Sequence, residues 1–122
     1  ETVAIRFKNS LQENAKTHAI AENIVESSHN GIVSWERQSS MVPIMIEGKD
    51  DHIKTKERWK ILREYFEVNN IKYNEIQSVD GNILSKVMCL IYTLDYSTIY
   101  YAVQLGIDPS PIRSIDFIKD RL

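Results

Sequence analysis

The sequence predicts an α/β fold with a parallel sheet, and three observations lead to this prediction. Residues 42–46 form a short apolar run between two serines and Gly48, as in a strand that is buried on both faces. A second, more alternating run lies at residues 71–79. An amphipathic stretch of about eighteen residues separates the two runs, which is long enough for the helical crossover between parallel strands.

Two strands are too few for a stable central sheet. We expect the remaining strands to precede residue 1, because an α/β domain usually begins with a strand. Two alternatives are that a partner chain supplies them, or that they lie in segments assigned differently here. The chain begins with Glu1 rather than methionine, and its first residues already have a helical pattern. We therefore expect a fragment whose fold is incomplete at the N-terminus.

Length and composition indicate one globular domain. The chain has 122 residues, of which 43% are apolar and 26% charged, enough for a core without disulfides. A net charge of −2 gives no general attraction to nucleic acid or to an anionic membrane. Cys89 is the single cysteine, and neither a signal peptide nor a membrane span is apparent, so the cytoplasm is the expected compartment.

Two helices are expected before the first strand. Residues 2–16 have apolar side chains at intervals of three and four, which predicts one buried helical face. A shorter helix is expected over residues 20–25, with Ile20 and Ile24 both facing inward. Asn30 and Gly31 then stop or redirect the backbone, and a short apolar element containing Ile32 follows.

Three more helices complete the pattern. Asp50 or Asp51 is expected to cap a helix over residues 52–69, which a left-handed turn at Asn69-Asn70 ends. The longest helix is expected over residues 83–105, and because it is apolar on most sides it should be deeply packed on the sheet. After Gly106 and a proline-rich loop, a short helix over residues 112–122 is expected to turn Ile115 and Ile118 inward.

One carboxylate and one histidine have flanks that suggest chemistry. Glu13 lies between two amides near the end of the first helix, and His29 lies between a pair of serines and Asn30. A carboxylate and an imidazole at adjacent helix ends are the groups needed for general acid–base catalysis on a carbon–oxygen substrate. If both line a cleft, the sequence predicts such a site.

Several segments, at matching separations, are similar to a known enzyme family. Two of them are the most specific: Arg6-x-Lys8 with Gln12-Glu13-Asn14-Ala15-Lys16, and His29-Asn30-x-Ile32-Val33-x-Trp35-Glu36. The others are Gly81-x-x-Leu84, Leu94-Asp95-Tyr96-x-x-x-Tyr100-x-Ala102, Gly106-Ile107-Asp108-Pro109-Ser110-Pro111-Ile112 and Ile115-x-x-Ile118-Lys119. Together they resemble the C-terminal half of the bifunctional phosphoglucose/phosphomannose isomerases of archaea and some bacteria, over essentially the whole chain.

The resemblance implies a three-layer αβα sandwich of the sugar-isomerase (SIS) type, with residues 1–122 as the C-terminal one of two such subdomains. It also implies a homodimer that interconverts glucose 6-phosphate or mannose 6-phosphate with fructose 6-phosphate through a cis-enediol, without a metal or other cofactor. The family's phosphate-binding serines and threonines, and an arginine near the reacting carbons, belong to an N-terminal half that these residues do not include.

The resemblance also assigns roles to individual residues. Glu13 matches the carboxylate that moves a proton between C1 and C2, and His29 matches an imidazole that assists ring opening from the neighbouring subunit. Lys119 matches a lysine near the ring oxygen. Ser110 stands where relatives often have a threonine that contacts substrate. In the segment after His29 the chain departs from the family, because Gly31 replaces a glutamate and Ser34 replaces a glycine.

Two other classes of function remain open at this stage: a sugar-phosphate-binding regulatory module, and a dimerisation domain without catalysis. Retention of Glu13, His29 and Lys119 together favours the enzyme over both. Other polar residues are interpreted structurally, with Arg6 in an ion pair and His18 and His52 without a functional role. Cys89 is expected to be a small buried side chain. The charged face of residues 52–69 is expected to be solvated, and no zinc, nucleotide or nucleic-acid motif is present.

Overall fold

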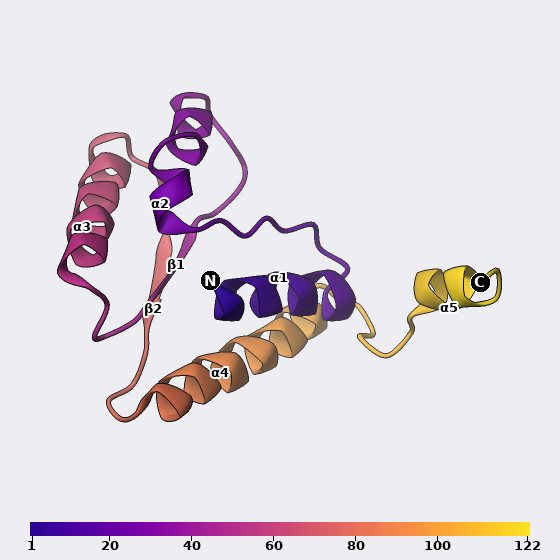
Figure 1. Ribbon diagram of the computed structural model, residues 1–122. Helices are drawn as coiled ribbons and strands as arrows, with labels where there is room; N and C mark the ends of the chain where they lie inside the picture. Colours follow the sequence, from indigo (N-terminus) through magenta and orange to yellow (C-terminus); the bar gives the residue numbers. More distant parts are fainter.

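In the computed structural model, which describes residues 1–122, helices lie on both faces of a small parallel sheet (Figure 1). The sheet consists of β1 (Ile44–Glu47) and β2 (Asn74–Gln77), paired in parallel with Ile44 opposite Asn74. The prediction of two neighbouring parallel strands is therefore confirmed, and so is a small α/β arrangement. A full three-layer sandwich is not confirmed, because two strands make only a minimal sheet.

The two faces of the sheet contact different helices, because side chains alternate along a strand. Ile46 and its partner Ile76 pack against the core that α1 and α4 form on one face. On the other face, Arg63 of α3 (Ile53–Val68) donates hydrogen bonds to Glu47 of β1 and Glu75 of β2. The expectation of burial on both faces is wrong for Ile44, which is 41% exposed at the start of β1.

The core lies between α1 (Thr2–Asn14) and α4 (Ile83–Gln104), which run side by side in the same direction (Figure 1). Val3 and Phe7 of α1 form one buried cluster with Leu90 and Leu94 of α4. Burial of each such side chain contributes about 1.5–3 kcal/mol to the free energy of unfolding. The apolar periodicity of the first helix therefore predicts its buried face correctly.

The prediction that α4 is deeply packed is wrong. Only the face toward α1 is buried, whereas Tyr92, Tyr96 and Val103 on other faces are mostly exposed. Cys89 is also exposed rather than buried. A sequence can show that a helix is apolar all round, but two elements can cover only part of its circumference.

The third helix, α3, begins and ends with side-chain and backbone caps. His52, rather than Asp50 or Asp51, is its N-cap, because the His52 Nδ1 accepts the backbone N–H of Lys54 at 3.2 Å. Asn70 has the predicted left-handed backbone (φ 54°), and the next N–H donates to the Phe66 carbonyl. Phe66 is 2% exposed and is the largest of the fully buried side chains.

The segment between α1 and β1 differs from the prediction. The helix expected over residues 20–25 is only α2 (Ile24–Ser27), since Asn23 caps it by accepting the N–H of Val25. Ile20 is therefore in extended chain and 73% exposed rather than inward. The short apolar element is the 3₁₀ helix η1 (Gly31–Glu36), whose Trp35 packs edge-on against Phe66.

The last helix, α5 (Arg113–Lys119), projects away from the rest of the chain (Figure 1). Ile115 and Ile118 are exposed, so the expectation that they face inward is wrong. None of the helices combines the length and the apolar character that a membrane crossing needs.

Candidate functional site

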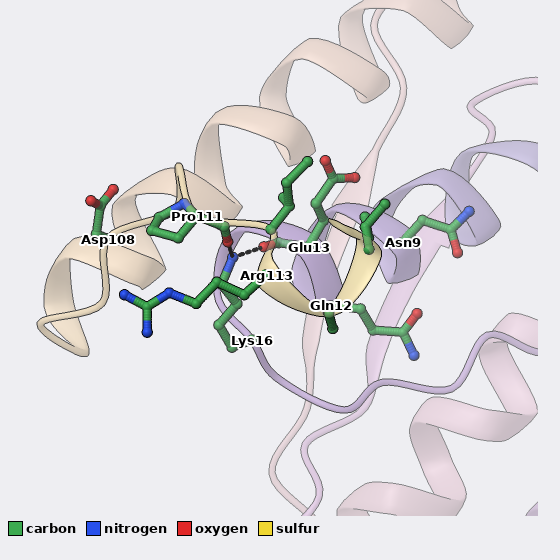
Figure 2. A pocket seen from close by; sticks show the side chains of 10 residues that line it. Asn9, Gln12, Glu13, Lys16, Asp108, Pro111 and Arg113 are labelled. Atoms are coloured by element: carbon green, nitrogen blue, oxygen red, sulfur yellow. Dashed lines mark hydrogen bonds between the residues drawn. The ribbon is translucent and has the colours of Figure 1, made fainter. Parts of the chain in front are cut away.

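A cleft lies where the end of α1 meets the loop after α4 and the first turn of α5 (Figure 2). Its volume is about 760 Å³. Most of its lining side chains are polar or charged. The full set of lining residues is Asn9, Gln12, Glu13, Lys16, Asp108, Pro111, Ile112, Arg113, Ser114 and Ile115. Of the four residues assigned from the sequence, only Glu13 lines this cleft.

The periodicity of α1 explains how its polar residues reach the cleft. Asn9, Gln12 and Glu13 follow one another at intervals of three and one, which places them on one helical face, and Lys16 lies just after the end of the helix. Val3 and Phe7 lie on the opposite side and are buried against α4. The packing of the apolar face therefore directs the polar face toward the loop and α5.

Polar contacts also fix α1 on α4. Asp95 of α4 accepts a hydrogen bond from the Arg6 Nη2 at 2.7 Å and another from the Ser10 hydroxyl at 2.7 Å. One turn further along, the Asn14 amide donates to the hydroxyl of the fully buried Thr98 at 2.8 Å. The structural ion pair expected for Arg6 is confirmed. These contacts hold the end of α1, and with it Glu13, beside α4.

Lys16 joins this helix end to the loop. Its ammonium donates to the carbonyl oxygens of Glu13 at 2.6 Å, Pro111 at 2.8 Å and Pro109 at 3.3 Å. Figure 2 shows the first two of these bonds, with Lys16 between Glu13 and Pro111. The Lys16 backbone is left-handed, with φ of 53°.

The loop itself is held by a turn. The Asp108 carboxylate accepts the backbone N–H of Ser110 at 2.9 Å, and this hydrogen bond lowers the pKa of Asp108 below its usual range, with a smaller contribution from the charge of Lys16. Ser110 is exposed and does not line the cleft, whereas Asp108 and Arg113 do. The cleft therefore contains two carboxylates and two basic side chains.

His29 is not brought to the cleft by its own chain. It follows α2 in the segment that packs on α3, where its backbone N–H donates to the Glu26 carbonyl at 2.9 Å (Figure 1). The assignment of His29 to a site completed by a neighbouring subunit stays a prediction. Lys119 lies at the end of α5 and is not among the cleft residues either, so its role also stays a prediction.

Sequence reasoning did not assign Lys16, Asp108 or Arg113 to the site. Lys16 and Asp108 stand in matched family segments, which could have indicated them. Nothing in the pattern around Arg113 distinguishes it from a surface charge. No three His, Cys, Asp or Glu side chains lie together in a way that could hold a metal ion.

This arrangement is suited to proton transfer on a polar substrate. Glu13 supplies a carboxylate at the edge of an open, mostly polar cleft that Lys16 and Arg113 also line. A carboxylate in such a cleft can accept a proton from a bound substrate.

The chain was compared with known proteins. Over residues 1–122 it matches the family model described as the bacterial phospho-glucose isomerase C-terminal SIS domain. It is similar to proteins named bifunctional phosphoglucose/phosphomannose isomerase from Caldicellulosiruptor bescii (29% identity over 100% of the chain) and Aquifex aeolicus (25% identity over 98%). A protein of the same name from Thermoplasma acidophilum is 23% identical over 99% of the chain.

The chain spans only 37–38% of the length of these curated relatives. No solved structure matches the chain significantly. The family model, in contrast, covers every residue from the first to the last, and its description agrees with the resemblance carried by the Glu13 and His29 segments. The chain therefore belongs to the family of bacterial phospho-glucose isomerase C-terminal SIS domains.

Proposed function

We propose that this chain is the C-terminal part of an enzyme that interconverts glucose 6-phosphate or mannose 6-phosphate with fructose 6-phosphate. The observation that carries the proposal is the position of Glu13 in the charged cleft, together with similarity over 98–100% of the chain to proteins named bifunctional phosphoglucose/phosphomannose isomerase. No metal or other cofactor takes part in the proposed chemistry.

The proposed reaction is a proton transfer between adjacent carbons. Glu13 removes the proton from C2 of the open-chain aldose phosphate, and the electrons of the C–H bond form the C1–C2 double bond of a cis-enediol while the C1 carbonyl oxygen gains a proton. Glu13 then delivers its proton to C1, and loss of the proton from the C2 hydroxyl gives the ketose. The number of atoms and the oxidation state of the whole sugar are unchanged.

Three further residues complete the proposal. His29 of the neighbouring subunit assists ring opening, because an imidazole can exchange protons near neutral pH. Lys119 supplies positive charge near the ring oxygen, and Ser110 contacts the sugar. Support for these three roles comes from their place in the matched family segments.

The test uses the full-length protein that contains this chain. Glu13→Gln keeps the size of the side chain but removes the base, so we expect exchange of the C2 proton with solvent to fall by about 10²–10⁴-fold. Binding of an open-chain sugar-acid phosphate should change little, because the residues expected to bind the phosphate lie outside this chain. Glu64→Gln on α3, exposed and outside the cleft, is the matched control.

Glu13 as the base is contradicted if Glu13→Gln exchanges the C2 proton at the wild-type rate, and isomerisation itself is contradicted if the wild-type protein does not exchange it. In that case retained binding of the sugar-acid phosphate would favour a sugar-phosphate-binding module instead.

A further inference from the structure

Lys16 makes an unusual set of contacts for an exposed lysine. All three of its acceptors are backbone carbonyl oxygens, one in α1 (Glu13) and two in the loop before α5 (Pro109 and Pro111). None of its hydrogen bonds goes to a carboxylate, although Glu13 and Asp108 line the same cleft. The ammonium therefore connects two backbone segments that are more than ninety residues apart in the sequence.

The number of donors limits what Lys16 can do. An ammonium has three N–H donors, and here three carbonyl oxygens accept from it. To donate to a substrate oxygen, Lys16 would have to release one of these carbonyls. Its contacts are thus those of a residue that holds other groups in place, rather than one that contacts the reacting atoms.

The end of α1 explains why a cation is favourable at this point. The Glu13 carbonyl belongs to the last turn of the helix, where carbonyl oxygens lack helical partners and carry partial negative charge. Lys16 follows the helix in a left-handed conformation (φ 53°), which non-glycine residues adopt infrequently, and its ammonium returns to this last turn. The ammonium that caps α1 through the Glu13 carbonyl also holds the loop through the Pro109 and Pro111 carbonyls.

The position of the loop matters because it carries cleft residues and leads into α5. Asp108 and Pro111 lie between α4 and α5, and Arg113 is the first residue of α5. Glu13 enters the cleft from the helix that Lys16 caps. The distance between the carboxylate of Glu13 and the side chains of the loop therefore depends on the bridge that Lys16 makes.

We propose that Lys16 is a positioning residue, which bridges the end of α1 to the loop of residues 109–111 and so sets the place of Glu13 relative to the rest of the cleft. This inference rests on the proposed function, because the group that Lys16 positions is the proposed base.

The experiment uses Lys16→Met in the full-length enzyme, since methionine keeps an unbranched chain of similar length but donates no hydrogen bond. We expect kcat to fall by about 10–100-fold with KM within about threefold of wild type, because a small displacement of a catalytic group slows the chemical step. Lys8→Met is the matched control, because Lys8 is on the same helix but outside the cleft.

Two further measurements separate positioning from a general structural role. When Lys16→Met is added to Glu13→Gln, the residual rate should fall by no more than about threefold. The base is already absent in Glu13→Gln, so a residue that acts only by positioning the base has little further effect. Amide hydrogen exchange of residues 107–115 should be faster in Lys16→Met, whereas exchange in α3 should match that of wild type.

The inference is overturned if Lys16→Met has the wild-type kcat, or if the loss of rate in the double variant equals the product of the losses in the two single variants. It is also overturned if KM alone rises, because that would indicate direct substrate binding. Failure of the proposed function looks different: the wild-type protein itself would not exchange the C2 proton.

Discussion

Asp95 of α4 joins the two helices of the core through its side chain. Its carboxylate accepts hydrogen bonds from Arg6 and Ser10, and it is half-buried between the two helices. The hydrogen bond from Arg6 lowers the pKa of Asp95 below its ordinary value of 3.8, against the opposing effect of burial. The pKa of Arg6 is raised for the same reason, so the guanidinium stays charged when the carboxylate titrates.

This shift predicts how stability depends on pH. Because the pKa of Asp95 is lower in the folded chain than in the unfolded one, its contribution is complete above pH 3.8 and is lost as the pH falls through the lower, folded-state value. Asp95→Asn should therefore reduce the free energy of unfolding near neutral pH and flatten its decline below pH 3.8.

Urea denaturation over a range of pH measures this effect. Asp120→Asn, near the end of the chain and exposed, is the control and should keep the wild-type slope. If Asp95→Asn declines as steeply as wild type in acid, Asp95 does not contribute through its charge.

At the scale of elements, the helix ends show how local chemistry ends each helix. Gly106 is left-handed (φ 67°) after α4, and the N–H of Ile107 donates to the Ala102 carbonyl at 2.9 Å. Asn70 ends α3 in the same way, with Ile71 donating to Phe66. A left-handed residue with a hydrogen bond that spans five residues is a common helix stop, and glycine and asparagine are the residues that tolerate it best.

The aromatic cluster around Phe66 joins three elements. The ring of Phe66 lies 5.7 Å from that of Trp35 in η1 and 5.6 Å from that of Tyr73, which precedes β2. Phe66→Ala should lower the free energy of unfolding by about 3–5 kcal/mol, because it removes both the buried area and the ring contacts and leaves a cavity.

The measurement is urea denaturation of the full-length protein, provided that the domain unfolds in a resolved transition. Ile61→Ala on the same helix is the control, since Ile61 is mostly exposed and its loss should cost less than about 0.5 kcal/mol. A loss below about 1 kcal/mol for Phe66→Ala would mean that the cluster does not hold α3 on η1 and β2.

At the scale of the whole molecule, the exposed apolar residues of α4 and the position of His29 both bear on how the complete protein assembles. Met88, Tyr92 and Ile99 of α4 are large apolar side chains that remain exposed. His29 follows α2, the helix that contacts α3, and does not line the cleft of its own chain. Both observations fit the proposal that the complete protein is a homodimer in which His29 serves the neighbouring site.

Mixed dimers test this proposal. In a dimer of Glu13→Gln with His29→Ala, one site would carry both changes and the other site neither, if His29 acts across the interface. Mixing the two inactive proteins under conditions of subunit exchange should then restore about a quarter of the wild-type isomerase activity, because half of the dimers are mixed and each has one intact site.

If Glu13 and His29 act within one subunit, every site in the mixture has one lesion and no activity returns. Sedimentation of the full-length protein as a monomer at micromolar concentration would also contradict the proposal. His18→Ala, another exposed histidine outside the cleft, is the control for the histidine change.

The sequence by itself determined the parts of this protein whose causes are local. Apolar periodicity predicts the buried face of α1, left-handed turns at Asn70 and Gly106 end α3 and α4 as expected, and two apolar runs separated by a helix become a parallel pair. The motifs at Glu13 and His29 were specific enough to indicate the family, because each places several chemically distinct residues at set separations.

Only the tertiary structure decided which side of each apolar element is covered. Ile20, Ile118 and most of α4 have apolar sequences but remain exposed, because burial depends on how many elements pack around a segment and not on its own composition. The sequence could not predict the bridge from Lys16 to Pro109 and Pro111 either. The bridge joins residues more than ninety positions apart, and its acceptors are backbone carbonyls, which every residue has.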